Sequence, residues 1–111
     1  MEIQQPKDPG YLNDFEKKHI PNVKLPKKIE AEQEIKIKVK EGEIGHPMIP
    51  EHYIIWIALY DGEQLLEKKK LSPGDEIKAE FKIKITPDMK LRVLQECNIH
   101  GIWEKEIESE I

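Results

Sequence analysis

Residues 53–71 read YIIWIALYDGEQLLEKKKL and predict a β-hairpin. The run from Tyr53 to Tyr60 is apolar throughout, which is typical of a well-buried strand. The Asp61–Gly62 pair that follows is a strong signal for a hairpin turn, because both positions of such a turn need backbone angles that these residues tolerate. Residues 64–71 then return as the partner strand, so the chain contains at least one antiparallel pair.

Alternating patterns on both sides of this hairpin extend the sheet structure. Apolar residues alternate with lysines over 35–40 and with charged residues over 77–85, and two further strands are expected over 91–97 and 102–107. Turn signals recur roughly every ten residues, and no segment has a convincing helical period. Residues 1–34 contain four prolines and are expected to be irregular. The fold class predicted is therefore all-β, an antiparallel β-sandwich of about seven strands with an irregular N-terminal segment.

Length and composition limit the class of protein. The chain has 111 residues, which predicts one domain over 1–111, with 38% apolar and 36% charged residues. It has no apolar run long enough for a transmembrane helix and no visible signal peptide, so we expect a cytoplasmic protein without a membrane partner. The net charge of −4 gives no basic field for nucleic acid. A single cysteine excludes an intramolecular disulfide framework and a four-cysteine metal centre.

Two short motifs contain three of the four histidines. His46 and His52 bracket the segment HPMIPEH, in which two prolines rule out a paired strand and leave a stiff loop. Taken alone, this segment is more typical of a surface loop with two exposed histidines. The second motif, Cys97-Asn98-Ile99-His100-Gly101, has the Cys-x-x-His spacing that lets a thiolate and an imidazole reach one metal from a tight turn.

The whole ligand set favours a redox metal. His19 lies in the proline-rich N-terminal region and by itself would be an ordinary exposed histidine. Together with the other four candidates it makes a set of one thiolate and four imidazoles, which suits iron, copper or zinc and does not suit calcium or magnesium. A closed structural zinc site needs only four ligands, so five candidates point towards redox chemistry.

The sequence resembles the superoxide reductase family, the neelaredoxin and desulfoferrodoxin group. The resemblance rests on HPMIPEHYIIWIALY, CNIHGIW and KKHIP, and runs from about Glu16 to Trp103. It implies an immunoglobulin-like β-sandwich with a mononuclear iron, one per chain, that reduces superoxide to hydrogen peroxide. The chain lacks the additional cysteines of the two-iron desulfoferrodoxins and so resembles the single-iron type. The implied iron ligands are His19, His46, His52 and His100 around the equator, with Cys97 as the axial thiolate.

The resemblance also implies roles for two residues that precede His19. Lys18 corresponds to the lysine that attracts the superoxide anion and assists proton delivery. In the family a glutamate directly precedes that lysine and can occupy the sixth iron position in the oxidised state. Here Lys17 stands in that place and the glutamate lies one residue earlier, at Glu16. Either the loop bulges so that Glu16 still reaches the iron, which we favour from sequence, or solvent takes the position.

The sequence also bears on the partners of the protein and on two alternative functions. The resemblance implies rubredoxin or a similar small iron protein as electron donor, and a homo-oligomer, often a tetramer in single-iron relatives. One alternative is a blue-copper electron carrier, which would place an axial methionine after the histidine of the Cys-x-x-His motif. All three methionines precede Cys97, which makes that alternative weaker. The other alternative is a β-sandwich interaction domain with a structural metal such as zinc.

Overall fold

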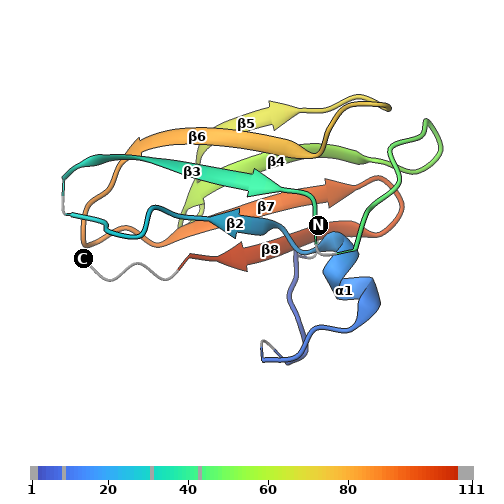
Figure 1. The fold of residues 1–111 in the computed structure, drawn as a ribbon, viewed down its shortest axis with the longest axis horizontal. Coiled ribbons are helices and arrows are strands. Elements are labelled where there is room, and N and C mark those ends of the chain that lie inside the picture. Colours follow the sequence, from blue (N-terminus) through green and yellow to red (C-terminus); the bar gives the residue numbers. More distant parts are fainter. Residues whose placement is uncertain (1–2, 9, 31, 43, 108–111) are drawn as a thin grey trace.

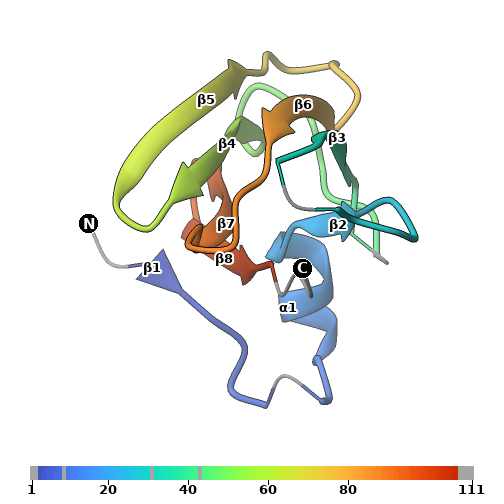
Figure 2. The ribbon, with the colours of Figure 1, turned by 90° about the vertical axis from the view of Figure 1, so that its left-hand side faces the viewer.

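The computed structural model describes residues 3–8, 10–30, 32–42 and 44–107 and contains two β-sheets (Figure 1). The larger sheet has the strand order β1-β8-β7-β4-β5, and the smaller one has the order β2-β3-β6. The elements are β1 (Ile3–Gln4), α1 (Asp14–His19), β2 (Asn22–Lys24), β3 (Glu34–Lys40), β4 (Ile54–Asp61), β5 (Gln64–Lys70), β6 (Lys78–Lys84), β7 (Leu91–Cys97) and β8 (Gly101–Glu106). The expected two-layer, all-β sandwich is confirmed, and Figure 2 shows the two layers edge-on.

The β4–β5 hairpin forms as the sequence predicts. Asp61 pairs with Gln64, and Gly62 has a φ of 58°, in the left-handed region that glycine adopts without steric cost. On its other side β4 pairs with β7, with Ile54 opposite Cys97. This register places the cysteine beside the loop that ends at His52, so the central strand pair already joins two of the motifs.

The core lies between the sheets, where the apolar residues of the alternating strands point. β3 follows a strict exposed–buried alternation, and Ile37, Ile57 and Val93 are fully buried. Burying one such aliphatic side chain contributes roughly 1.5–3 kcal/mol to folding. A smaller cluster around Trp56 and Leu94 covers the other face of the larger sheet. This packed interior fixes the strand ends from which the site loops emerge.

The N-terminal region differs from the expectation. Residues 1–34 were expected to be irregular, but β1, α1 and β2 lie within this range, and the described part of the chain has eight strands. The pairing of β1 with β8 is parallel, so the larger sheet is mixed. Sequence periodicity cannot find these elements, because α1 has six residues and β1 only two. Among the described residues, no helix is long and apolar enough to cross a membrane.

Candidate metal centre

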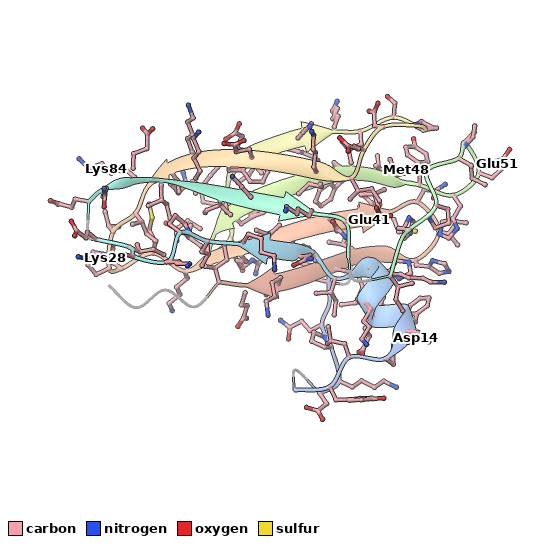
Figure 3. All side chains as sticks on the ribbon, in the orientation of Figure 1. Asp14, Lys28, Glu41, Met48, Glu51 and Lys84 are labelled. Carbon is pink, nitrogen blue, oxygen red and sulfur yellow. The ribbon has the colours of Figure 1, made fainter. Side chains whose placement is uncertain are left out.

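Three chain segments meet at one end of the sandwich and bring the expected ligands together. They are the last turn of α1, the loop between β3 and β4, and the turn between β7 and β8. Figure 3 shows Met48 and Glu51 of the β3–β4 loop at the same end of the molecule as Asp14 of α1. Gly42 is the second residue of that loop and packs directly on the helix: a Cβ atom there would lie 2.0 Å from the carbonyl oxygen of Lys17. The helix and the loop can approach this closely only because position 42 is glycine.

Four of the five expected ligands converge on one point. The ligand atoms of His19, His46, His52 and Cys97 all lie within 4.8 Å of one another. His100 adjoins this group, since its Nδ1 is 3.0 Å from Nε2 of His19 and 3.6 Å from Sγ of Cys97. The ring centroids of His52 and His100 are 5.1 Å apart. The structure thus brings all five residues of the predicted set to one place, with His100 at its edge.

Hydrogen bonds to the far side of two rings orient their nitrogens toward the centre. Nδ1 of His19 donates to the carbonyl of Phe15 at 2.7 Å, and Nδ1 of His46 donates to that of Pro47 at 2.7 Å. In a neutral imidazole, a donating Nδ1 leaves Nε2 with a free lone pair. Nε2 of His46 and Nε2 of His52 are both buried and have no hydrogen-bond partner. Buried polar atoms of this kind are rare in folded proteins, and a metal ion would satisfy them.

Burial favours the neutral form of three of the site imidazoles, those of His19, His46 and His52. The pKa of His19 is lowered from 6.5 to about 4, mainly by burial and further by the neighbouring histidines, against the opposing effect of the hydrogen bond to the Phe15 carbonyl. Burial likewise lowers the pKa of His46 and of His52. The Lys18 ammonium contributes to the lowered pKa of His52, which shows that its charge acts on the site. Neutral imidazoles and a thiolate are the protonation states that bind a transition metal.

This donor set fits iron. Three or four imidazoles with one thiolate suit a borderline transition metal. The buried, unpartnered Nε2 atoms of His46 and His52 are available to coordinate it. His19, His46, His52 and Cys97 would hold the ion, and His100 is the fifth donor in reach. Carboxylates are absent from the converging group, which disfavours calcium and magnesium.

Comparison with known proteins shows the family of the chain. A family model described as Desulfoferrodoxin matches residues 12–106. The chain belongs to the desulfoferrodoxin family. It is 36% identical over 104 residues to a superoxide reductase of Pyrococcus abyssi, covering 84% of this chain and 88% of that protein. A solved neelaredoxin structure from Ignicoccus hospitalis, the T24K variant, superposes with a TM-score of 0.74 at 31% identity over 97% of this chain and 94% of the other.

A further relative is matched over only part of its length. A desulfoferrodoxin homologue of Methanothermobacter thermautotrophicus is 43% identical over 67 residues, which are 60% of this chain and only 52% of that protein. The chain therefore spans about half the length of this desulfoferrodoxin relative.

Asn98 links the two ligand-bearing turns of this desulfoferrodoxin. Its Oδ1 accepts from the backbone N–H of Tyr53 at 2.9 Å, and its Nδ2 donates to the carbonyl of Glu51 at 3.0 Å. The backbone N–H of Asn98 also donates to the carbonyl of Tyr53. Because Tyr53 and Glu51 flank His52, these bonds hold the loop of His52 against the turn of Cys97. The sequence does not predict this role, because it depends on backbone groups of Tyr53 and Glu51 that the fold brings beside the turn.

Two glutamine side chains hold the backbone of other ligands. Gln95 on β7 is 1% exposed, and its Nε2 donates to the carbonyl of His19 at 2.7 Å. Gln4 on β1 donates to the carbonyl of His100 at 2.6 Å, and Nε1 of Trp103 donates to the same oxygen at 3.1 Å. Trp103 also stacks on the ring of His19, with centroids 5.3 Å apart. Trp103 is 4% exposed and therefore forms a buried wall of the site.

The structure gives Glu16 contacts other than those expected. Its segment is the helix α1 and not the bulged loop that the sequence suggested. One carboxylate oxygen accepts from the backbone N–H of Asn13 at 3.0 Å, and the other accepts from that of Lys7 at 3.0 Å. These two bonds lower the pKa of Glu16. The bond from Asn13, the N-cap residue, completes a capping box, so the carboxylate turns back towards the start of the helix.

Proposed function

We propose that this chain is a superoxide reductase, which adds one electron and two protons to superoxide and forms hydrogen peroxide. The observation that carries the proposal is the convergence of three imidazoles and one cysteine sulfur within 4.8 Å, with buried and unpartnered Nε2 atoms on His46 and His52. When bound there, a mononuclear iron would supply the electron by cycling between its ferrous and ferric states. Family membership supports both the metal and the substrate.

The proposed roles of the chain's residues follow from their surroundings. His19, His46, His52 and His100 are proposed as the four nitrogen ligands and Cys97 as the sulfur ligand. His19 and Cys97 are each 1% exposed, so water is excluded from this side of the site. Donation of the Nδ1 protons to carbonyl oxygens keeps His19 and His46 in one orientation and one tautomer. These two imidazoles would therefore be held in place by the protein before any metal binds.

Lys18 is proposed to attract superoxide and to help deliver protons. It is partly exposed on α1 next to His19, and its positive charge acts on the His52 ring. A cation at the mouth of a small site raises the local concentration of an anionic substrate, and this effect falls as salt screens the charge. Glu16 is proposed to hold α1 through its two amide bonds, which leaves the sixth position of the oxidised metal to solvent.

Further properties are proposed from the resemblance. They are a small iron protein such as rubredoxin as the electron donor, a cytoplasmic location and a homo-oligomeric state. A copper carrier, which would need an axial methionine ligand, finds less support. No methionine follows His100 in the sequence, and the sulfur of Met48 accepts a hydrogen bond from the Ile54 backbone N–H at 3.3 Å. The experiment below separates a superoxide reductase from an interaction domain with structural zinc, because zinc would leave the protein redox-silent.

The test is the purified chain loaded with iron, oxidised mildly and examined by electron paramagnetic resonance and visible spectroscopy. We expect one high-spin ferric ion per chain and a sulfur-to-iron charge-transfer band that Cys97→Ser abolishes. Lys18→Ile should slow the reaction with superoxide at least tenfold at low salt and weaken its salt dependence, whereas Lys90→Ile should leave both unchanged. A cupric signal, or a redox-silent protein that retains zinc, would refute the proposal.

A further inference from the structure

The smaller sheet presents a strongly basic outer face in a chain whose net charge is −4. We call it the lysine face; it consists of the outward-facing residues of β2, β3 and β6. Its lysines are Lys24, Lys36, Lys38, Lys40, Lys78, Lys82 and Lys84. Two glutamates, Glu34 and Glu80, are the acidic residues on it. The remainder of the molecule must therefore be markedly acidic, and the positive charge is concentrated on one layer of the sandwich.

The strand register places lysine opposite lysine at three positions on this face, and lysine opposite glutamate at two, Lys38–Glu80 and Glu34–Lys84. Lys24 lies opposite Lys38, and two further lysine pairs join Lys36 to Lys82 and Lys40 to Lys78. Like charges at directly opposite positions destabilise a sheet. Within the described residues, one ion pair crosses between β3 and β6, from Lys36 to Glu80 at 3.4 Å. The sheet thus retains repulsive pairs that an acidic partner would relieve.

The lysine face is also hollowed along β3. A hollow of about 550 Å³ lies between β3 and the segment that follows β2. Its lining includes five lysines and one glutamate, and one of these lysines, Lys28, comes from the loop that follows β2. Such a depression can receive acidic side chains that project from another protein, so shape and charge favour the same kind of occupant.

The lysine face leads to the metal centre. Lys40 is the last residue of β3, and the carboxylate of the next residue, Glu41, accepts from the backbone N–H of His46 at 2.9 Å. Gly42 then packs on the carbonyl of Lys17 in α1. Figure 3 shows Lys84 and Lys28 at one end of the sheet and Glu41 towards the end where α1 lies. A protein docked along this face therefore reaches the helix that carries Lys18 and His19.

We propose that the lysine face is the docking surface for an acidic electron-donor protein that reduces the metal centre. This inference rests on the proposed function, since a reductase of superoxide must receive one electron for each turnover. A second copy of the chain is a poorer occupant, because a two-fold contact would place lysines against lysines. Nucleic acid is also disfavoured, because the sequence pI of 5.6 means that the rest of the molecule repels a polyanion.

The test uses a triple variant and a matched control in the iron-loaded protein. The face variant carries Lys24→Glu, Lys40→Glu and Lys82→Glu, which convert the three lysine pairs into Lys–Glu pairs and so should not impair folding. The control carries Lys70→Glu, Lys90→Glu and Lys105→Glu, all exposed and off this face, with the same change in net charge. The probe is a reduced rubredoxin of net negative charge, whose oxidation by the ferric protein is followed by stopped flow at increasing salt.

We expect the face variant to slow this electron transfer at least tenfold at low salt and to lose its salt dependence, with the control within twofold of the unmodified protein. Zinc-substituted rubredoxin, which is redox-inert, should shift the amide resonances of β2, β3 and β6. The proposal would be overturned if the shifts were confined to residues 46–52 and 97–101, or if the two variants gave equal rates. It would also be overturned by salt-dependent self-association through the face, or by duplex DNA that binds more tightly than rubredoxin. The pre-reduced face variant should react with superoxide at the normal rate. If the unmodified protein did not react with superoxide at all, that result would refute the proposed function and not the docking surface.

Discussion

At the scale of single residues, the site depends on side chains that fix the ligands as much as on the ligands themselves. The five expected ligand residues could be found from sequence because cysteine and histidine are rare and have recognisable spacings. Gln95 and Asn98 could not be found, since glutamine and asparagine are common and their role depends on a carbonyl or amide brought near by the fold. Spacing along the chain carries no information about such contacts.

Gln95 gives the prediction that belongs to this scale. Gln95→Leu removes the donor to the His19 carbonyl and leaves that buried oxygen unpaired, which costs about 1–3 kcal/mol of folding free energy. The orientation of His19 should also loosen, so iron affinity should fall about ten- to a hundredfold. Chelator competition measures the affinity, with Gln64→Leu on the exposed strand β5 as the control. Equal iron affinity in both variants would show that Gln95 has no positioning role.

At the scale of elements, strands were predictable and the helix was not. Alternation over 35–40 and 77–85 and the Asp–Gly turn specify strands locally, because one face of each strand must be buried. The helix α1 has only six residues, and its stability comes from the Asn13–Glu16 capping box and from packing by His19 and Glu16, both buried. Six residues are too few for a helical period, and isolated helices of this length do not persist in water.

Glu16 gives the prediction at this scale. Glu16→Ala removes the acceptor for two backbone N–H groups and should lower the free energy of unfolding by about 1–2 kcal/mol. The spectrum of the ferric protein should keep the same dependence on pH, because the carboxylate serves the helix and not the metal. Denaturant unfolding and a pH titration of the ferric spectrum measure the two effects, with Glu63→Ala as an exposed control. A ferric spectrum that changes in this variant would instead support Glu16 as a metal ligand.

At the scale of the whole molecule, the sandwich holds a group of neutral histidines that the unfolded chain would protonate. The folded pKa of His19 is about 4, below its ordinary value of 6.5, so the unfolded state binds more protons between these values. Its contribution to stability is present above pH 6.5 and is lost as the pH falls through 6.5 towards 4. The shift corresponds to a contribution on the order of 3 kcal/mol.

The metal-free protein should therefore unfold at progressively lower denaturant concentration as the pH falls from 6.5 to 4. His19→Gln should reduce this slope, because one of the titrating groups is then absent. Denaturation midpoints at several pH values measure the effect. A stability that is constant over this interval would contradict neutral burial of the site histidines.

The central claim, reduction of superoxide at the His/Cys centre, is tested most directly by the stoichiometry of its products. The iron-loaded, reduced protein is mixed with a known amount of superoxide, and hydrogen peroxide and dioxygen are both measured. Reduction predicts one hydrogen peroxide for each superoxide consumed, one iron oxidised for each, and no dioxygen from the reaction. Dioxygen formed together with half that yield of peroxide would show dismutation, and an unreactive ferrous site would show that the centre does not act on superoxide.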